Sequence, residues 1–193
     1  MTTTEQPLLA PYPKAILLRD GTEVILRPLT GTDKTRLLQF FERVPAEERY
    51  YLKENVTAPE TIQRWTSAID LERVIPIVAL EGDRIIADAT LHRSRAQAFR
   101  HLGELRIVVD PAYREVGLGR RMIRELLDLA ADLGLHKVTF QLVEQREDPA
   151  IFAAESIGFA EVAVLKEWVR DIWGNYQNLV LLEMPVQDQR AWW

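Results

Sequence analysis

One stretch of the chain decides the fold: Val108-Val109-Asp110-Pro111-Ala112-Tyr113-Arg114-Glu115-Val116-Gly117-Leu118-Gly119-Arg120-Arg121. An apolar run ends at Pro111, and two glycines then open a segment whose apolar residues have helical spacing. Glycine lets a backbone turn tightly and approach a ligand closely, while the free N–H groups and the dipole of a first helical turn attract anions. Four arginines against one glutamate give residues 114–124 a local charge of +3. The stretch therefore predicts a strand, a phosphate-binding turn and a helix, in that order.

Three known phosphate-binding patterns can be compared with this turn. A Walker A loop needs a Gly-Lys pair, and the chain contains none. A dinucleotide-binding fingerprint needs a third small residue where Met122 stands, and the turn follows four predicted strands; an NAD-binding domain stays a weaker alternative. The third pattern, [Q/R]-x-x-G-x-[G/A], is matched by residues 114–119.

This third pattern resembles the pyrophosphate-binding turn of the GNAT superfamily of N-acetyltransferases. The preceding Glu104–Arg114 is similar to the central strand of that family and its V-x-P-x-Y-R exit. Downstream, Gly158-Phe159 is similar to the pair that ends the last helix of the family, and Gly21–Leu29 more weakly resembles its first strand. The resemblance covers roughly residues 16–185 and is strongest over 102–160.

The resemblance implies the fold and the cofactor. It implies an α/β (α+β) GNAT fold, with a mixed central sheet of about 6–7 strands flanked by about 4–5 helices. It also implies acetyl-CoA as co-substrate, with the central strand splaying from its neighbour so that free backbone groups bind the thioester carbonyl and pantetheine. The main chain of Ile107, Val108 and Val109 would take that role, and the pyrophosphate would bind at Arg114, Glu115, Val116, Gly117, Leu118, Gly119 and Arg120.

Acetyl transfer to an amine also needs a proton acceptor and a way to stabilise the leaving thiolate. Glu104 is the candidate general base, acting directly or through water; the alternative is a solvated charge beside Arg106. The sequence departs from the family at the general acid, because Ala154 and Glu147 stand where the family has tyrosine and asparagine. The thiolate then leaves through solvent or another tyrosine, such as Tyr113 or Tyr176, or the chain is a catalytically weak acyl-CoA-binding sensor or regulatory module.

The rest of the chain predicts a single domain. Hairpin signals indicate antiparallel pairs, and the strand–helix–strand unit over 102–109, 117–133 and 136–143 indicates a parallel crossover, so the sheet is mixed. A length of 193 residues fits one domain. We expect an N-terminal arm at 1–15, a GNAT domain at 16–186 and a C-terminal tail at 187–193.

Composition narrows the function classes. With 47% hydrophobic and 27% charged residues the chain is expected to fold alone. The net charge of −5 argues against nucleic acid and membrane partners and suits a cationic amine acceptor. The absence of cysteine excludes a cysteine-linked acyl-enzyme, and the three histidines lack metal-ligand spacing, so no metal is expected. We expect a cytoplasmic protein, with Trp192-Trp193 docking on its own domain or on a second subunit as a homodimer.

Overall fold

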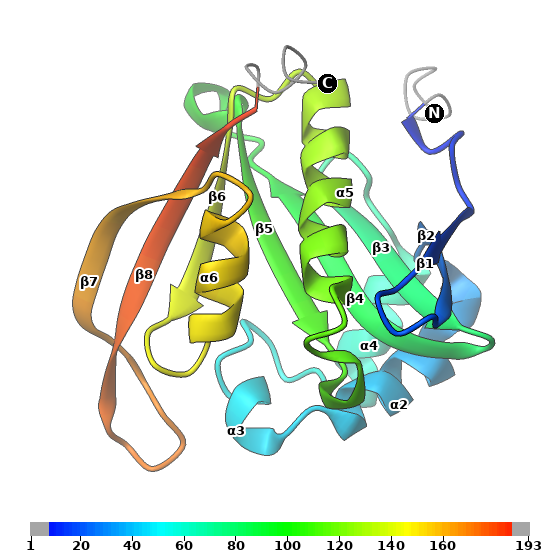
Figure 1. Ribbon diagram of the computed structural model, residues 1–193, viewed down its shortest axis with the longest axis horizontal. Helices are drawn as coiled ribbons and strands as arrows, with labels where there is room; N and C mark the ends of the chain where they lie inside the picture. Colours follow the sequence, from blue (N-terminus) through cyan, green and yellow to red (C-terminus); the bar gives the residue numbers. More distant parts are fainter. Residues whose placement is uncertain (1–7, 187–193) are drawn as a thin grey trace.

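A computed structural model describes residues 8–186 and shows one mixed sheet between two layers of helices (Figure 1). The eight strands are β1 Lys14–Leu17, β2 Glu23–Pro28, β3 Val74–Glu81, β4 Arg84–Arg93, β5 Leu102–Val109, β6 Lys137–Val143, β7 Ala160–Arg170 and β8 Tyr176–Pro185. The five α-helices of the described residues are α2 Lys34–Arg43, α3 Ala46–Arg49, α4 Pro59–Ser67, α5 Leu118–Asp132 and α6 Asp148–Glu155. Short 3-10 turns lie at η1 Gly31–Asp33, η2 Gln97–Phe99 and η3 Pro111–Tyr113.

The strands lie in the order β1-β2-β3-β4-β5-β6-β8-β7. All neighbours are antiparallel except β5 and β6, which run parallel because α5 crosses over between them. The predicted GNAT fold with its mixed sheet is confirmed. The sheet has eight strands in the described residues instead of the expected six or seven, because both arms of the first hairpin pair in it.

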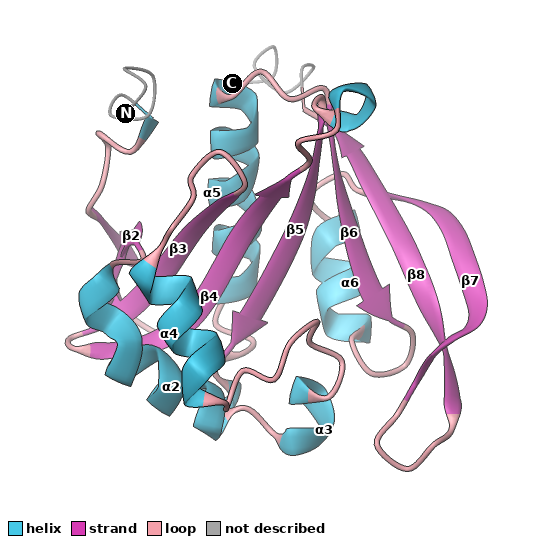
Figure 2. Cartoon of the chain, turned by 180° about the vertical axis from the view of Figure 1, so that it is seen from behind, coloured by secondary structure: helices cyan, strands magenta, loops and turns pink. Residues whose placement is uncertain are grey.

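Two hydrophobic clusters hold the layers together. On one face α5 packs its apolar stripe on β4 and β5, with α6 beside it (Figure 1). On the other face α2 and α4 cover the first half of the sheet (Figure 2). Residues alternate along β4, so that Ala87, Ala89 and Leu91 face α5, while Asp88 faces the α2 side together with its neighbour Val78 on β3.

The structure describes part of the expected N-terminal arm and none of the expected C-terminal tail. Within residues 8–15, Leu8, Leu9 and Tyr12 pack against the core, and the Tyr12 hydroxyl donates to buried Glu125 on α5 at 2.6 Å. Strand β1, Lys14–Leu17, spans the expected boundary at residue 15. Residues 1–7 and the expected tail at 187–193, including Trp192-Trp193, lie outside the described residues. Within residues 8–186, every helix is too short or too polar to cross a membrane.

Candidate functional site

The parallel pair β5 and β6 separates half way along its length. The two strands pair from Leu102 with Lys137 to Leu105 with Phe140, and no pairing between them continues beyond that point in the described residues. Both strands run on, β5 to Val109 paired with β4, and β6 to Val143 paired with β8 (Figure 1). The backbone edge of residues 106–109 therefore lacks a neighbouring strand on the β6 side.

The side chains next to this edge show the same separation. Ile107, Val108 and Val109 are apolar residues in the middle of an eight-stranded sheet, and all three are only half-buried. Backbone N–H and C=O groups at a sheet edge need a hydrogen-bond partner, which a ligand can provide. The structure therefore places the three residues that were expected to bind pantetheine on an open edge.

The glycine turn follows directly. Gly117 has φ +91°, a backbone conformation that residues other than glycine rarely adopt. It is the N-cap residue of α5, so no side-chain hydrogen bond caps this helix. The turn is tied to the first hairpin, because the Arg19 backbone N–H donates to the Val116 carbonyl at 3.2 Å. Leu118 is fully buried in the core, so it can meet a ligand only through its backbone. The N–H groups at the start of α5 thus lie beside the open edge of β5 with no side-chain cap.

Two arginines of the turn have partners in the protein. Arg114 donates to both carboxylate oxygens of Glu48 on α3, at 3.0 and 2.5 Å, and also to the Val109 carbonyl at 3.3 Å. Arg120 donates to the Ser156 hydroxyl at 2.5 Å. Each member of the Arg114–Glu48 pair is 41% exposed, so the pair contributes little to stability and can be exchanged for a phosphate.

Glu104 lies earlier on β5, on the face that carries α2 and α4. Its carboxylate accepts a hydrogen bond from Arg106 Nε at 2.8 Å, and Lys53 Nζ lies 3.8 Å away. Burial by itself would raise the pKa of Glu104, but Arg106 and Lys53 outweigh it and the pKa is lowered. Glu104 is therefore ionised at neutral pH, as a proton acceptor must be, although a lowered pKa makes it a weaker base.

The two residues that differ from the family pattern, Ala154 and Glu147, both have contacts that serve the fold. Ala154 is a fully buried residue of α6. Glu147 accepts the Val143 backbone N–H at 2.6 Å where β6 ends, and burial raises its pKa. Of the two alternative tyrosines, the Tyr113 hydroxyl donates to Glu81 on the β3–β4 hairpin, and Tyr176 is 63% exposed at the start of β8. Neither tyrosine has a contact that places its hydroxyl on the open edge of β5.

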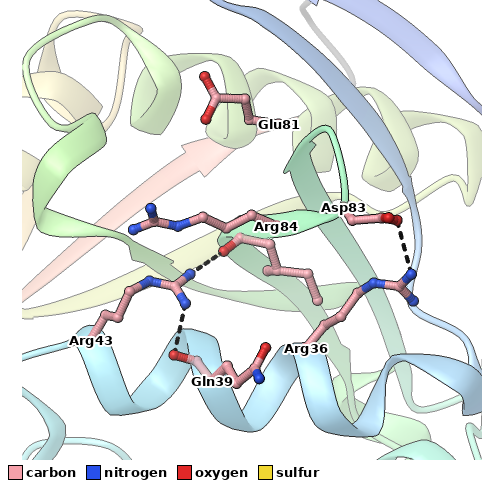
Figure 3. Close-up of a pocket in the computed structure, with 7 residues that line it drawn as sticks. Arg36, Gln39, Arg43, Glu81, Asp83 and Arg84 are labelled. Carbon is pink, nitrogen blue, oxygen red and sulfur yellow. Dashed lines mark hydrogen bonds and ion pairs between the residues drawn. The ribbon is translucent and has the colours of Figure 1, made fainter.

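A cavity of about 470 Å³ lies elsewhere, between α2 and the β3–β4 hairpin (Figure 3). Its arginines already have partners: Arg36 pairs with Asp83 at 2.9 Å, and Arg43 and Arg84 both donate to Asp110, at 2.6 and 3.0 Å. Asp110 is buried and also accepts the Ala112 N–H at the exit of β5. These hydrogen bonds to Asp110 hold the segment between β5 and the glycine turn in place. The arginines that line the cavity therefore help to position the candidate site.

The structure thus brings together residues 107–109 and 114–120 at one end of β5, with Glu104 further along the same strand. Sequence reasoning missed Glu48 and Lys53, which come from the region between β2 and β3, and the network around Asp110. It also missed Asp88, although a lone acidic residue inside the apolar run 85–91 is a visible signal.

The chain is similar to two named N-acyltransferases. It is 28% identical to the L-amino acid N-acyltransferase MnaT of Escherichia coli over 126 residues, which is 65% of this chain and 72% of that protein. It is 39% identical to the N-alpha-acetyltransferase RimI of Mycobacterium tuberculosis over 64 residues, 33% of this chain and 38% of that protein.

Solved structures agree on the fold. The yncA protein of Salmonella typhimurium, solved with acetyl-CoA, superposes with a TM-score of 0.71 at 19% identity, covering 86% of this chain and 95% of that one. The ribosomal-protein-S5-alanine acetyltransferase of Vibrio fischeri gives a TM-score of 0.74 at 16% identity, covering 86% and 94%. The model of the acetyltransferase (GNAT) family matches residues 36–159, from α2 to the residue before β7. Because that match spans more than half of its length, the chain belongs to the GNAT family of acetyltransferases.

Proposed function

We propose that this chain is an N-acetyltransferase that moves the acetyl group from acetyl-CoA directly to a primary amine of a small molecule or a protein. The observation that carries the proposal is the open edge of residues 106–109 beside the uncapped start of α5. The open edge of β5 offers backbone groups for the thioester and pantetheine. The start of α5 offers N–H groups and arginines for the two phosphates. Family membership supports the same assignment.

The proposed chemistry uses the chain's own groups at each step. Backbone N–H groups of residues 107–109 polarise the thioester carbonyl, and residues 114–120 hold the pyrophosphate. Glu104 lies three residues before Ile107, so it acts through water, and it is the proposed acceptor of the proton that the nitrogen loses once it has attacked the thioester. The thiolate leaves through solvent, because Ala154 supplies no hydroxyl where the family has tyrosine.

Thiol release from acetyl-CoA tests the proposed function. The full chain is incubated with acetyl-CoA and a panel of polyamines, amino acids, aminoglycosides and lysine peptides, and free CoA thiol is measured. We expect release that depends on one class of amine, together with an acetylated product. Tight acetyl-CoA binding without release for any amine would instead favour the alternative, an acyl-CoA-binding sensor or regulatory module, which the loss of tyrosine at Ala154 suggests.

Glu104→Gln is expected to lower kcat about tenfold and to leave acetyl-CoA affinity unchanged. The loss is largest near pH 6, because hydroxide, the alternative acceptor for this proton, is scarcest there. The pH profile of kcat checks this, with the exposed Glu161→Gln on β7 as control. An unchanged profile in Glu104→Gln would remove Glu104 from the proposed mechanism.

Glu48→Gln is expected to tighten acetyl-CoA binding by up to about fivefold. Glu48 occupies the Arg114 guanidinium, and an exposed pair of this kind is worth at most about 1 kcal/mol, so freeing Arg114 for a phosphate gains no more than that. Isothermal titration of both proteins measures the difference. Weaker binding in the variant would mean that the Arg114–Glu48 pair itself orients the site.

We further propose a cytoplasmic protein that acts without nucleic acid and forms a homodimer. The dimer is supported by exposed aromatic side chains on the β7–β8 hairpin: Trp168 is 65% exposed, Trp173 63% and Tyr176 63%. Aromatic side chains gathered on one exposed element are common at protein interfaces. The molar mass in solution, measured by light scattering, shows whether the protein is a monomer or a homodimer.

A further inference from the structure

A second carboxylate lies on the same face of the sheet as Glu104. Asp88 sits in the middle of β4, opposite Val78 on β3 and Val108 on β5. The residue is 8% exposed, so it is almost entirely withdrawn from water. The two helices α2 and α4 cover the neighbouring part of this face (Figure 2).

Asp88 differs from the other buried acids in having no partner. Within residues 8–186, no hydrogen bond or ion pair reaches its side chain. Each of the other four has one: Arg27 for Asp33, Arg43 for Asp110, Tyr12 for Glu125 and Asn175 for Asp171. A buried carboxylate without a partner lowers the stability of the fold, whereas an apolar residue on the same rung would pack against Val78. The contacts of Asp88 give no structural reason for an acid here.

The register places Asp88 beside the open edge. Its partner Val108 lies past the point where β6 leaves β5, among the residues proposed to hold the thioester. Glu104 is opposite His92, four residues further along β4, a separation of about 13 Å at the rise of a strand. Asp88 is therefore much closer than Glu104 to the backbone of Ile107 and Val108.

We propose that Asp88 is a catalytic residue of this site, and that its carboxylate takes the first proton from the ammonium group of the acceptor. The proposal rests on the proposed function. The ammonium gives one proton to Asp88, and the neutral amine attacks the thioester carbonyl carbon. The C–N bond forms and the C–S bond breaks, and the nitrogen passes its second proton through water to Glu104. The thiolate takes a proton from water, and Glu104 returns its proton to water. Asp88 then releases its proton to solvent.

The charge surroundings agree with this role. Burial raises the pKa of Asp88 to about 7, and no charged neighbour contributes to that shift. Along the same face the titratable and charged groups His92, Arg106, Glu104 and Lys53 interact electrostatically with one another, and Arg43 of α2 donates to Asp110. The partner on β3 is the apolar Val78. A group that titrates near neutral pH is well matched to accept a proton and release it in each cycle.

Asp88→Asn tests the proposal through activity. We expect kcat to fall about 100-fold, with the Kd for acetyl-CoA unchanged, since the amide keeps the shape and cannot accept the proton. The wild-type kcat rises with pH through about 7, and this rise is absent from Asp88→Asn but retained in Glu104→Gln. Asp83→Asn, the same chemical change at an exposed position of the β3–β4 hairpin, is the matched control and keeps the wild-type profile.

Thermal unfolding of the same variant tests whether the unpartnered carboxylate of Asp88 lowers the stability of the fold. The folded-state pKa of Asp88 lies above its unfolded value near 3.8, so wild-type protein loses stability as pH rises from about 4 to 7. Asp88→Asn escapes this loss, and its melting temperature should exceed that of wild type by a margin that grows from pH 4 to pH 8. A variant that is more stable and less active is the signature of a residue kept for function.

The outcomes separate this proposal from the proposed function. If wild-type protein releases thiol and Asp88→Asn keeps its kcat and its rise near pH 7, Asp88 is not the proton acceptor. A lower melting temperature in Asp88→Asn would show that Asp88 serves the fold, and would also overturn the proposal. If wild-type protein binds acetyl-CoA but releases no thiol with any amine, the proposed function fails, and the role of Asp88 fails with it.

Discussion

Gly119→Glu is expected to remove most of the affinity for acetyl-CoA and to leave the protein folded. A Cβ at Gly119 would meet only Val109 Cγ2 at 3.8 Å, an ordinary contact, so the backbone accepts a side chain there. A carboxylate in the first turn of α5 interacts favourably with the helix dipole, by about 0.3–1 kcal/mol, so stability is kept or slightly raised. The same carboxylate occupies the N–H groups proposed for the pyrophosphate and repels it. We expect the Kd for acetyl-CoA to rise by at least about 100-fold.

Calorimetric titration with acetyl-CoA and a melting curve together measure this result. Gly119→Ala is the matched control, because it adds only the Cβ and should bind with nearly wild-type affinity. Substitution of Gly117 would be less informative, since its φ of +91° strains any other residue and confuses loss of binding with loss of fold. A stable Gly119→Glu protein with wild-type affinity would place the phosphates away from the start of α5.

Arg27→Met is expected to destabilise the protein by about 3 kcal/mol. Asp33 is completely buried and accepts two hydrogen bonds from Arg27, at 2.6 and 2.7 Å. Removing one partner of a buried ion pair costs about 3–5 kcal/mol, and Arg27 is 25% exposed, so the lower end applies. The pair fixes the entrance to α2, which covers the face that carries Asp88 and Glu104. Urea unfolding measures the change.

The pair of Arg27 and Asp33 also predicts that the stability of the protein depends on pH. Burial by itself would raise the pKa of Asp33, but hydrogen bonds from Arg27 and Thr30 outweigh it and lower the pKa to about 2. Because the folded-state pKa is depressed, this contribution to stability is present above about pH 4 and is lost as pH falls toward 2. Arg36→Met, at 3.6 Å from Asp33 and more exposed, is the control and should cost less than about 1 kcal/mol. Equal effects of both substitutions would contradict the dominant role of Arg27.

The strand, turn and helix around the glycines could be predicted from the sequence because their signals are local. Strand 102–109 matches β5 residue for residue, and the helix expected at 117–133 is α5 at 118–132. Alternation of apolar residues, a proline exit and two glycines act within a few residues of one another, so no tertiary knowledge is needed.

Features that depend on distant pairing could not be predicted from these residues. The point where β5 and β6 separate is set by the pairing of β6 with β8, about 40 residues later, and was expected only through the family resemblance. The pairing of Arg114 with Glu48 depends on α3, a four-residue helix too short for a periodic pattern. The missing partner of Asp88 can be recognised only once β3, β5 and α2 are in place around it.

A crystal structure of the chain with CoA tests the central claim most directly. We predict pantetheine along the open edge of β5, hydrogen-bonded to the backbone of residues 107–109, with the pyrophosphate oxygens within about 3.2 Å of the N–H groups at residues 117–120. The Arg114 guanidinium should turn from Glu48 toward a phosphate. CoA seated instead in the cavity among Arg36, Arg43 and Arg84, with residues 106–109 unoccupied, would contradict the assignment of the site.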